Sequence, residues 1–259
     1  MRDGQPRARG DGGEIKALHH GLEILSLMVR AGRPLSATAI GERVGLHQTS
    51  VSRIIRTLSA DGYVRRAGSR GYVPDFGVFA LGTAAVEGFH LVDTARPAME
   101  DIAAEFDGFE ATLATLWRGE LLHFNRTRLG QASIPFSSRG FPFHLSSAAL
   151  RLMADRPHAE AIALLEQSRD RQGWKRPTDR VPGTPAEIAD LLGSAVERGV
   201  LILRRWVTES HVAGSIDVEL PNYPPFALSV AGEAERVDDD SLRLWLHEAR
   251  RRVEKDFVP

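Results

Sequence analysis

The chain has 259 residues, of which 42% are hydrophobic, and a formal net charge of -1, so it is long enough for two globular domains. It contains no cysteine, which excludes disulfides, thiolate nucleophiles and thiolate metal sites. No apolar run has the length of a membrane span and the first residues lack the apolar core of a signal peptide, so we expect a cytoplasmic protein with no membrane partner.

The N-terminal residues predict a short tail followed by two helices. Residues 1–13 are rich in Gly and Arg, which is typical of a disordered tail. Leu18, Leu22, Leu25 and Met28 or Val29 recur at helical spacing and predict a helix from about Lys16 to Val29. Ser36 is a suitable N-cap for a second, short helix, whose apolar side is Ala37, Ile40 and Val44, and Gly45 supplies the turn that ends it.

The third predicted helix, from Leu46 to about Ala60, has an unusual polar side. Val51, Ile54, Ile55 and Leu58 form an apolar stripe, and no Asp or Glu occurs between residues 46 and 60. At 100 degrees per residue, Thr49, Ser52, Arg53 and Arg56 lie roughly opposite that stripe, with Gln48 and Ser50 at the N-terminal tip. A surface helix normally mixes acidic with basic residues, so this pattern indicates a polyanion as the partner.

Residues 63–74 form two β-prone runs around a Gly-Ser turn and predict a hairpin. Three helices followed by a hairpin, in residues 14–75, are the order of a winged helix-turn-helix, whose third helix enters the major groove of DNA. The first 75 residues carry 12 basic and 7 acidic side chains, which supports a nucleic-acid partner. The candidate DNA-binding residues are Gln48, Thr49, Ser50, Ser52, Arg53, Arg56, Arg65 and Arg70.

Two alternatives to DNA binding remain open at this point. The third helix could be a polar surface helix of another kind of domain, or the winged helix could act only through protein contacts. The first is disfavoured because the hairpin, the turn glycine and the charge asymmetry agree, and the second because the arginines of the third helix have no acidic neighbours.

The rest of the chain predicts a linker helix over residues 76–92, with a share in a dimer contact, and a second domain over residues 93–259. A helix that opens at Asp93 precedes a predicted hairpin, and alternating runs near the C-terminus predict three further strands. The second domain is therefore α+β with a largely antiparallel sheet. Its predicted helices span residues 146–154, 157–167 and 184–198 and a segment from about residue 240, and its strands span residues 113–117, 121–124, 200–207, 211–220 and 226–231.

The whole order resembles the IclR family of bacterial transcription regulators. The resemblance rests on Gly45-Leu46, Ser50-Val51-Ser52-Arg53 and Gly62-Tyr63-Val64 in the first domain, and on Ala95-Arg96-Pro97, residues 142–154, Glu209 with Gly214, and residues 227–230 in the second. It implies a winged helix-turn-helix, a linker helix and a GAF-like α/β effector-binding domain with an antiparallel sheet. The implied partners are double-stranded operator DNA, a small-molecule effector and a second copy of the chain, as a homodimer or a dimer of dimers.

The resemblance also places an effector site around the loop before the helix at residues 146–154 and on the strands that follow Gly214. The implied effector-binding residues are His144, Ser146, Ser147, Ala149, Ser215, Asp217 and Ser229. Alternation puts Ser215, Asp217 and Glu219 on one face of their strand, where Asp217 could accept a hydrogen bond from a ligand amine or hydroxyl. Equally, Asp217 and Glu219 could simply face solvent.

An enzyme or a metal-binding protein that uses the second domain is the main alternative function. The sequence contains no His-Glu-x-x-His, no Gly-x-Ser-x-Gly and no phosphate-binding glycine loop. Glu209 and His211 would reach a metal only if His123 or His144 converged on them in space. We therefore expect a regulator that is not an enzyme and has no cofactor, no catalytic residue and no metal site.

Overall fold

Three helices and a small hairpin form the N-terminal unit of the computed structural model, which describes residues 15–106, 108–128 and 141–257. Of Arg70 only the backbone is described. The chain divides into two compact units, Met1–Gly88 and Phe89–Pro259. The tail predicted over residues 1–13 lies outside the described residues.

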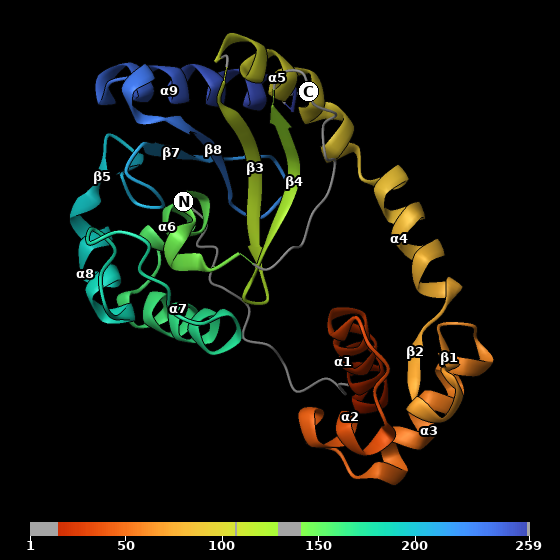
Figure 1. The fold of residues 1–259 in the computed structure, drawn as a ribbon. Helices are drawn as coiled ribbons and strands as arrows, with labels where there is room; N and C mark the ends of the chain where they lie inside the picture. Colours follow the sequence, from red (N-terminus) through yellow and green to blue (C-terminus); the bar gives the residue numbers. More distant parts are fainter. Residues whose placement is uncertain (1–14, 107, 129–140, 258–259) are drawn as a thin grey trace, which may run out of the picture. The chain divides into compact units, whose positions relative to one another are not determined.

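The first unit has the predicted order of elements (Figure 1): α1 (Lys16–Ala31), α2 (Ala37–Val44), α3 (Gln48–Ala60), β1 (Val64–Arg66) and β2 (Tyr72–Pro74). Its core is formed by side chains from the three helices and β1, together with Leu35 from the segment before α2: Ile24, Met28, Leu35, Ile40, Val51, Ile55 and Val64. The stripe predicted on α1 is only partly correct, because Leu18, Leu22 and Val29 are exposed while Gly21, Ile24 and Met28 are buried.

The helix that follows the wing is shorter than predicted. α4 (Phe76–Gly88) ends at Gly88, and α5 (His90–Glu105) begins two residues later, so Asp93 lies in the first turn of α5 instead of opening it. None of the described residues of α4 is buried. No single helix among the described residues is long and apolar enough to cross a membrane, and only α4 and α5 taken together have the length and composition of a span.

A six-stranded antiparallel sheet is the centre of the second unit. Its order is β4-β3-β8-β7-β6-β5, and every neighbouring pair is antiparallel. The strands are β3 (Glu110–Trp117), β4 (Glu120–Arg128), β5 (Val196–Glu197), β6 (Val200–Arg204), β7 (His211–Val218) and β8 (Phe226–Glu233).

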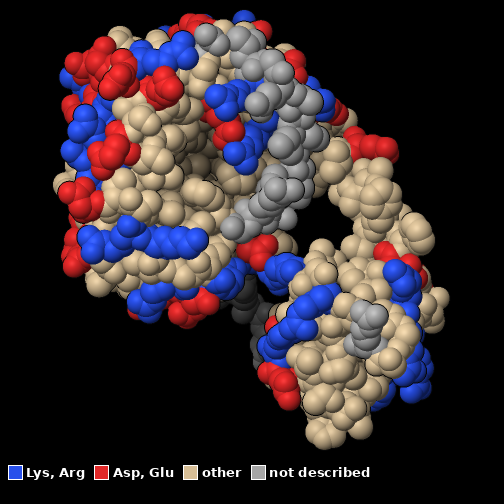
Figure 2. Space-filling view, viewed as in Figure 1, with Lys and Arg blue, Asp and Glu red and all other residues tan. Residues whose placement is uncertain are grey.

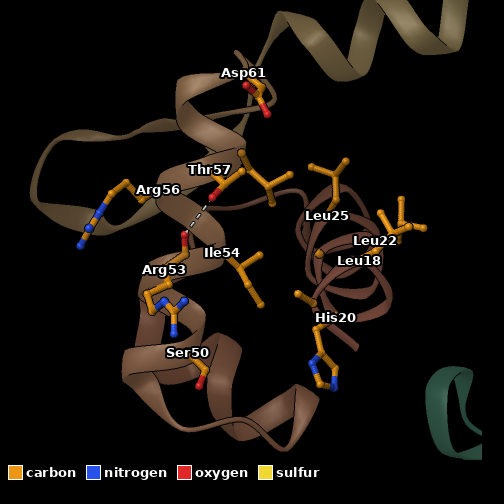
Figure 3. Close-up of a pocket in the computed structure, with 13 residues that line it drawn as sticks. Leu18, His20, Leu22, Leu25, Ser50, Arg53, Ile54, Arg56, Thr57 and Asp61 are labelled. Carbon is orange, nitrogen blue, oxygen red and sulfur yellow. Dashed lines mark hydrogen bonds between the residues drawn. The ribbon is translucent and has the colours of Figure 1, made fainter. Parts of the chain in front are cut away.

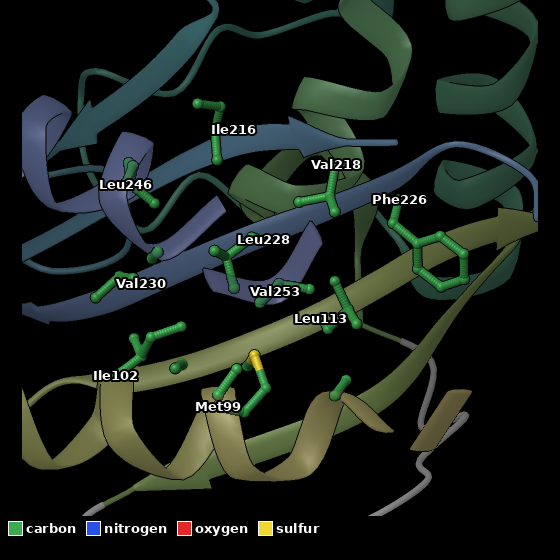
Figure 4. Packing of buried hydrophobic residues seen from close by; sticks show 14 of the residues in the cluster. Met99, Ile102, Leu113, Ile216, Val218, Phe226, Leu228, Val230, Leu246 and Val253 are labelled. Carbon is green, nitrogen blue, oxygen red and sulfur yellow. The ribbon is translucent and has the colours of Figure 1, made fainter. Parts of the chain in front are cut away.

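Helices cover both faces of this sheet (Figure 1). α5 and α9 (Asp239–Lys255) pack on one face over a core that includes Met99, Ile102 and Leu246 (Figure 4). On the other face, α6 (Ser147–Ala154) contacts the strands, with α7 (His158–Gln172) and α8 (Pro185–Ala195) outside it. Period-2 burial on β7 puts Ile216 and Val218 toward α9, and therefore Ser215 and Asp217 toward α6.

Two helix boundaries differ from the prediction for local reasons. α7 continues to Gln172 and ends at Gly173, whose φ of 77° favours glycine. α8 ends at Ala195 instead of near Arg198, because Val196 and Glu197 pair with β6 as the short strand β5. The capping box of Thr184 and Glu187 at the start of α8 forms as expected.

Candidate DNA-binding surface and effector site

The turn between α2 and α3 is tight and depends on two glycines. The Ser36 side chain caps α2 by accepting a hydrogen bond from the Ala39 amide at 3.1 Å. Gly45 ends the helix in the left-handed region with φ of 68°. A Cβ on Gly41 would lie 2.5 Å from the Leu46 carbonyl oxygen, so only glycine allows the chain to turn so closely into α3.

The polar side of α3 is open to solvent. Val51 and Ile55 anchor the helix in the core, whereas Gln48, Ser50, Arg53 and Arg56 are exposed and Ser52 is half-buried. Among the residues that the structure describes, neither Arg53 nor Arg56 forms an ion pair. The two guanidinium groups are therefore available to an external anion such as a DNA phosphate, or to a guanine edge.

Thr49 has a local partner that the sequence did not reveal. His47 is the N-cap of α3, and its Nδ1 lies 3.0 Å from the Thr49 hydroxyl and accepts from the Thr49 amide at 3.4 Å. A contact from Thr49 to DNA would thus compete with the cap of the helix.

The wing, which follows α3 in the chain, carries three further arginines. In the β1–β2 ladder Arg65 faces Val73 and Arg66 faces Tyr72. Arg65 is exposed, and its Nε lies 3.6 Å from a carboxylate oxygen of Asp75. Arg70 is in the turn of residues 68–70, and its side chain lies outside the description. Figure 2 shows basic side chains along the margin of this unit that carries the wing.

In the second unit, the loop before α6 and two strands bring most of the predicted effector-binding residues together. Ser147 on α6 and Ser229 on β8 place their hydroxyl oxygens 2.6 Å apart in a buried contact. Ser215, next to Ser229 in the sheet, donates to the Leu228 carbonyl at 3.0 Å. Ser146 caps α6 by accepting from the amide of Ala149, which is itself fully buried.

His144 lies in the same loop and is fully buried. Its Nε2 donates to the Lys175 carbonyl at 2.8 Å, and its ring stacks on Trp174 at 4.0 Å between centroids. Burial lowers the pKa of His144 below its usual value, while the hydrogen bond to Lys175 opposes that shift. The Nδ1 atom is then an unprotonated acceptor, and it has no hydrogen-bond partner among the described residues.

Asp217 is already bound by two arginines of its own chain. Its carboxylate accepts from Arg151 on α6 at 2.7 Å and from Arg250 on α9 at 3.2 Å. Glu219 follows the end of β7 and is exposed. Asp217 therefore takes part in an ion-pair network within its own chain, and Glu219 is exposed to solvent.

The sequence reasoning missed two polar residues of this region. Thr112 on β3 is buried and faces Ser229, so a row of hydroxyls crosses three neighbouring strands. Arg151 is almost fully buried. The sequence does not predict this burial, because a single arginine in a helix is normally expected to face solvent. β3 is buried on both faces and has a buried threonine on each, Thr112 and Thr115, so alternation along the strand does not single out Thr112. No group of three or more His, Asp or Glu in the described chain could hold a metal ion.

Comparisons with known proteins agree with the family resemblance. Residues 17–68 match the model of the IclR helix-turn-helix domain. The chain is 23% identical over 241 residues to the acetate operon repressor of Salmonella typhimurium, covering 89% of this chain and 84% of that protein. The predicted resemblance to the IclR family is thereby confirmed.

The structure of an IclR family regulator from Brucella abortus aligns over 100% of this chain and 97% of its own, with a TM-score of 0.72 and 20% identity. An IclR homolog from Microbacterium hydrocarbonoxydans, solved with 4-hydroxybenzoate, aligns over 93% of this chain and 98% of its own, with a TM-score of 0.61 and 20% identity. The predicted fold class is thereby confirmed. Residues 17–68 therefore form a helix-turn-helix domain of the IclR type, and the curated relatives that the chain matches over most of its length are transcriptional repressors and not enzymes.

Proposed function

We propose that this IclR-family regulator binds a palindromic operator as a dimer or a dimer of dimers, with Arg53 and Arg56 as its main DNA contacts. The observation that carries the proposal is the exposed side of α3, where both guanidinium groups lack an acidic partner among the described residues. Gln48, Ser50 and Ser52 add hydrogen-bonding groups on or beside this side. Thr49, Arg65 and Arg70 complete the proposed contacts, the last two through the wing.

The proposed regulation is a linkage between a small organic effector and DNA binding. Support comes from the buried hydroxyl pair of Ser147 and Ser229 and from the unpaired Nδ1 acceptor of His144, since a buried polar group without a partner favours a ligand that supplies one. Ser146, Ala149 and Ser215 would shape the same site. An effector that prefers one conformation of the second unit shifts the population, and with it the affinity for DNA.

The DNA contacts are tested by fluorescence anisotropy with DNA from upstream of the gene, at two salt concentrations and with nonspecific competitor. Arg53→Ala should weaken specific binding by about 1 to 3 kcal/mol if Arg53 reads a base. Arg180→Ala removes the same charge from an exposed position of the second unit and is the matched control. Unchanged binding by the Arg53 variant would remove this residue from the proposed interface.

The effector site is tested by calorimetric titration with 4-hydroxybenzoate as the first probe, followed by other small aromatic and aliphatic acids. Ser229→Ala should weaken the binding of whichever probe binds by about tenfold or more, as expected for one lost buried hydrogen bond. Ser194→Ala, an exposed serine on α8, is the control. Equal affinities in both variants would refute the proposed role of Ser229.

A further inference from the structure

Two hollows in the described surface differ in their lining. The larger, of about 690 Å³, lies between α1 and α3 and is lined in part by Arg53 and Arg56 (Figure 3), so it adjoins the proposed DNA-binding surface. The smaller, of about 220 Å³, lies in the second unit, and we call it the charged pocket. It shares no residue with the proposed effector site, and all but one of its lining residues are charged: Arg180, Arg204, Arg205, Glu209, Ala234 and Glu235.

Three segments that are distant in the sequence meet at the charged pocket, and hydrogen bonds hold them together. The Ala234 amide donates to the Ser210 carbonyl at 2.7 Å, which joins the turn after β8 to the loop between β6 and β7. The Thr178 hydroxyl donates to the Trp206 carbonyl at 3.1 Å, which joins the segment after α7 to the same loop. The backbone of the pocket is therefore in place before any ligand binds.

Arg204 belongs to the wall of the pocket. Its guanidinium group donates to the Asp239 carboxylate at 2.5 Å, to the Ala234 carbonyl at 2.6 Å and to the Val237 carbonyl. Each of its three guanidinium nitrogens thus has a partner in the chain. Arg204 stabilises the pocket, and the recognition of a ligand falls to the other charged side chains.

Those other four side chains do not pair with one another. Arg180, Arg205, Glu209 and Glu235 are all exposed. Within residues 15–106, 108–128 and 141–257, none of the four side chains forms an ion pair or a hydrogen bond. Two cations and two carboxylates that line one pocket are therefore available to a ligand that carries both kinds of charge.

The backbone of Arg205 adopts a conformation that favours glycine, with φ of 55°. Arg118 and Arg198 also have positive φ, but each precedes a glycine in the two-residue turn of a hairpin, where such values are normal. Arg205 precedes Trp206 in a longer loop, so no hairpin turn explains its conformation. Strained residues persist only where the surrounding structure holds them, and they occur often at ligand sites.

We propose that the charged pocket binds a small amino acid. Arg180 and Arg205 hold its carboxylate, because a guanidinium group can donate to both carboxylate oxygens. Glu209 and Glu235 accept hydrogen bonds from its ammonium group, which has three donors. The volume of about 220 Å³ is below the roughly 300 to 1,000 Å³ of pockets for drug-sized ligands, so the side chain of the amino acid is short.

Ligands with only one kind of charge fit less well. An inorganic anion or a nucleic-acid phosphate would meet the like charges of Glu209 and Glu235. A metal ion would lie beside two guanidinium groups, and no group of three or more His, Asp or Glu in the described chain could hold one. An amino acid uses all four unpaired side chains and adds no net charge to the pocket.

The test is calorimetric titration of the full chain with each proteinogenic amino acid. Acetate, methylamine and inorganic phosphate are the probes that carry one kind of charge. At least one amino acid with a short side chain should bind with a Kd below about 1 mM, and the three single-charge probes should bind at least about tenfold more weakly.

Arg205→Gln and Glu209→Gln should each weaken the binding of that amino acid by about tenfold or more, as expected when a hydrogen bond between charged groups is lost. Arg118→Gln is the matched control, because it removes an exposed arginine that also has positive φ. Its affinity for the amino acid should equal that of the parent.

A further variant separates recognition from folding. Arg205→Gly removes the guanidinium group and also relieves the strained backbone, because glycine adopts positive φ without cost. Its unfolding temperature should therefore be no lower than that of the parent, while its binding of the amino acid is weakened as in Arg205→Gln. Weak binding by a stable protein would show that the guanidinium group itself contacts the ligand.

Three results would overturn the inference: no amino acid with a Kd below about 1 mM, an equal affinity for acetate, or unchanged affinity in Arg205→Gln. Binding that is lost in Ser229→Ala but kept in Arg205→Gln would place the amino acid in the proposed effector site and refute the charged pocket. The operator titration contains no amino acid, so Arg180→Ala stays a control there, and the proposed function and this inference can fail separately.

Discussion

The guanidinium group of Arg151 on α6 lies 2.7 Å from the carboxylate of Asp217 on β7, and this ion pair connects the helix to the sheet. Arg151 also donates to the Gly199 carbonyl at 2.8 Å and to Asp155 at 2.6 Å, so each of its three guanidinium nitrogens has a hydrogen-bond partner. Arg250 brings α9 to the same carboxylate from the other face of the sheet. One acidic residue thereby joins both helical layers at the edge of the proposed effector site.

Asp217→Ala should lower the free energy of unfolding of the second unit by about 2 kcal/mol, because it leaves Arg151 buried with one carboxylate instead of two. Asp155→Ala removes a largely exposed partner of the same arginine and should cost less than about 1 kcal/mol. Urea denaturation of both variants measures the difference. Equal losses would mean that Asp217 contributes no more than a surface ion pair.

Gly41→Ala should destabilise the winged helix-turn-helix by at least about 2 kcal/mol, because the added Cβ would lie 2.5 Å from a backbone oxygen in the α2–α3 turn. Gly193→Ala is the matched substitution inside α8, where nothing lies within 4 Å of the added methyl group. This second change should stabilise its helix by about 0.5 to 1 kcal/mol. Thermal unfolding should therefore shift in opposite directions, and a tolerated Gly41→Ala would contradict the tight turn.

The stability of the second unit should fall as the pH drops below about 6.5. Burial lowers the pKa of His144, so below its usual value of 6.5 the unfolded chain binds a proton that the folded chain does not. The contribution is complete above pH 6.5 and is lost as the pH falls. His123 and His211 shift in the same direction through burial, so they share the effect.

His144→Gln keeps a donor for the Lys175 carbonyl but removes one titrating group. Between pH 7.5 and 5.5, the unfolding temperature of this variant should fall less than that of the parent. His90→Gln, at an exposed position, should match the parent. A variant whose stability falls as steeply as that of the parent would show that His144 is not one of the groups responsible.

Arg56→Ala should change the salt dependence of operator binding if Arg56 contacts a phosphate. The slope of the logarithm of affinity against the logarithm of salt concentration should become less steep by about 1. Binding should weaken about equally on specific and nonspecific DNA. An unchanged slope together with altered sequence preference would instead assign Arg56 to a base.

The sequence by itself determined most of the elements and their order, because these depend on local chemistry. The cap at Ser36, the left-handed turn at Gly45 and the capping box at Thr184 act within a few residues of the chain, and each forms as predicted. The absence of carboxylates on α3 is likewise a property of one segment. For the same reason the helices and hairpin of the first unit, and most of the individual strands of the second, could be predicted.

Only the tertiary structure decided what each side chain faces. The apolar repeat of α1 predicted a helix, but packing buried Ile24 and Met28 and left Leu18 and Leu22 outside. Asp217 lay on the predicted side of its strand, yet its partners come from residues 66 and 33 positions away. The spacing of hydrophobic residues shows that a helix or strand has an apolar face. Which segment packs on that face depends on how distant parts of the chain fold together.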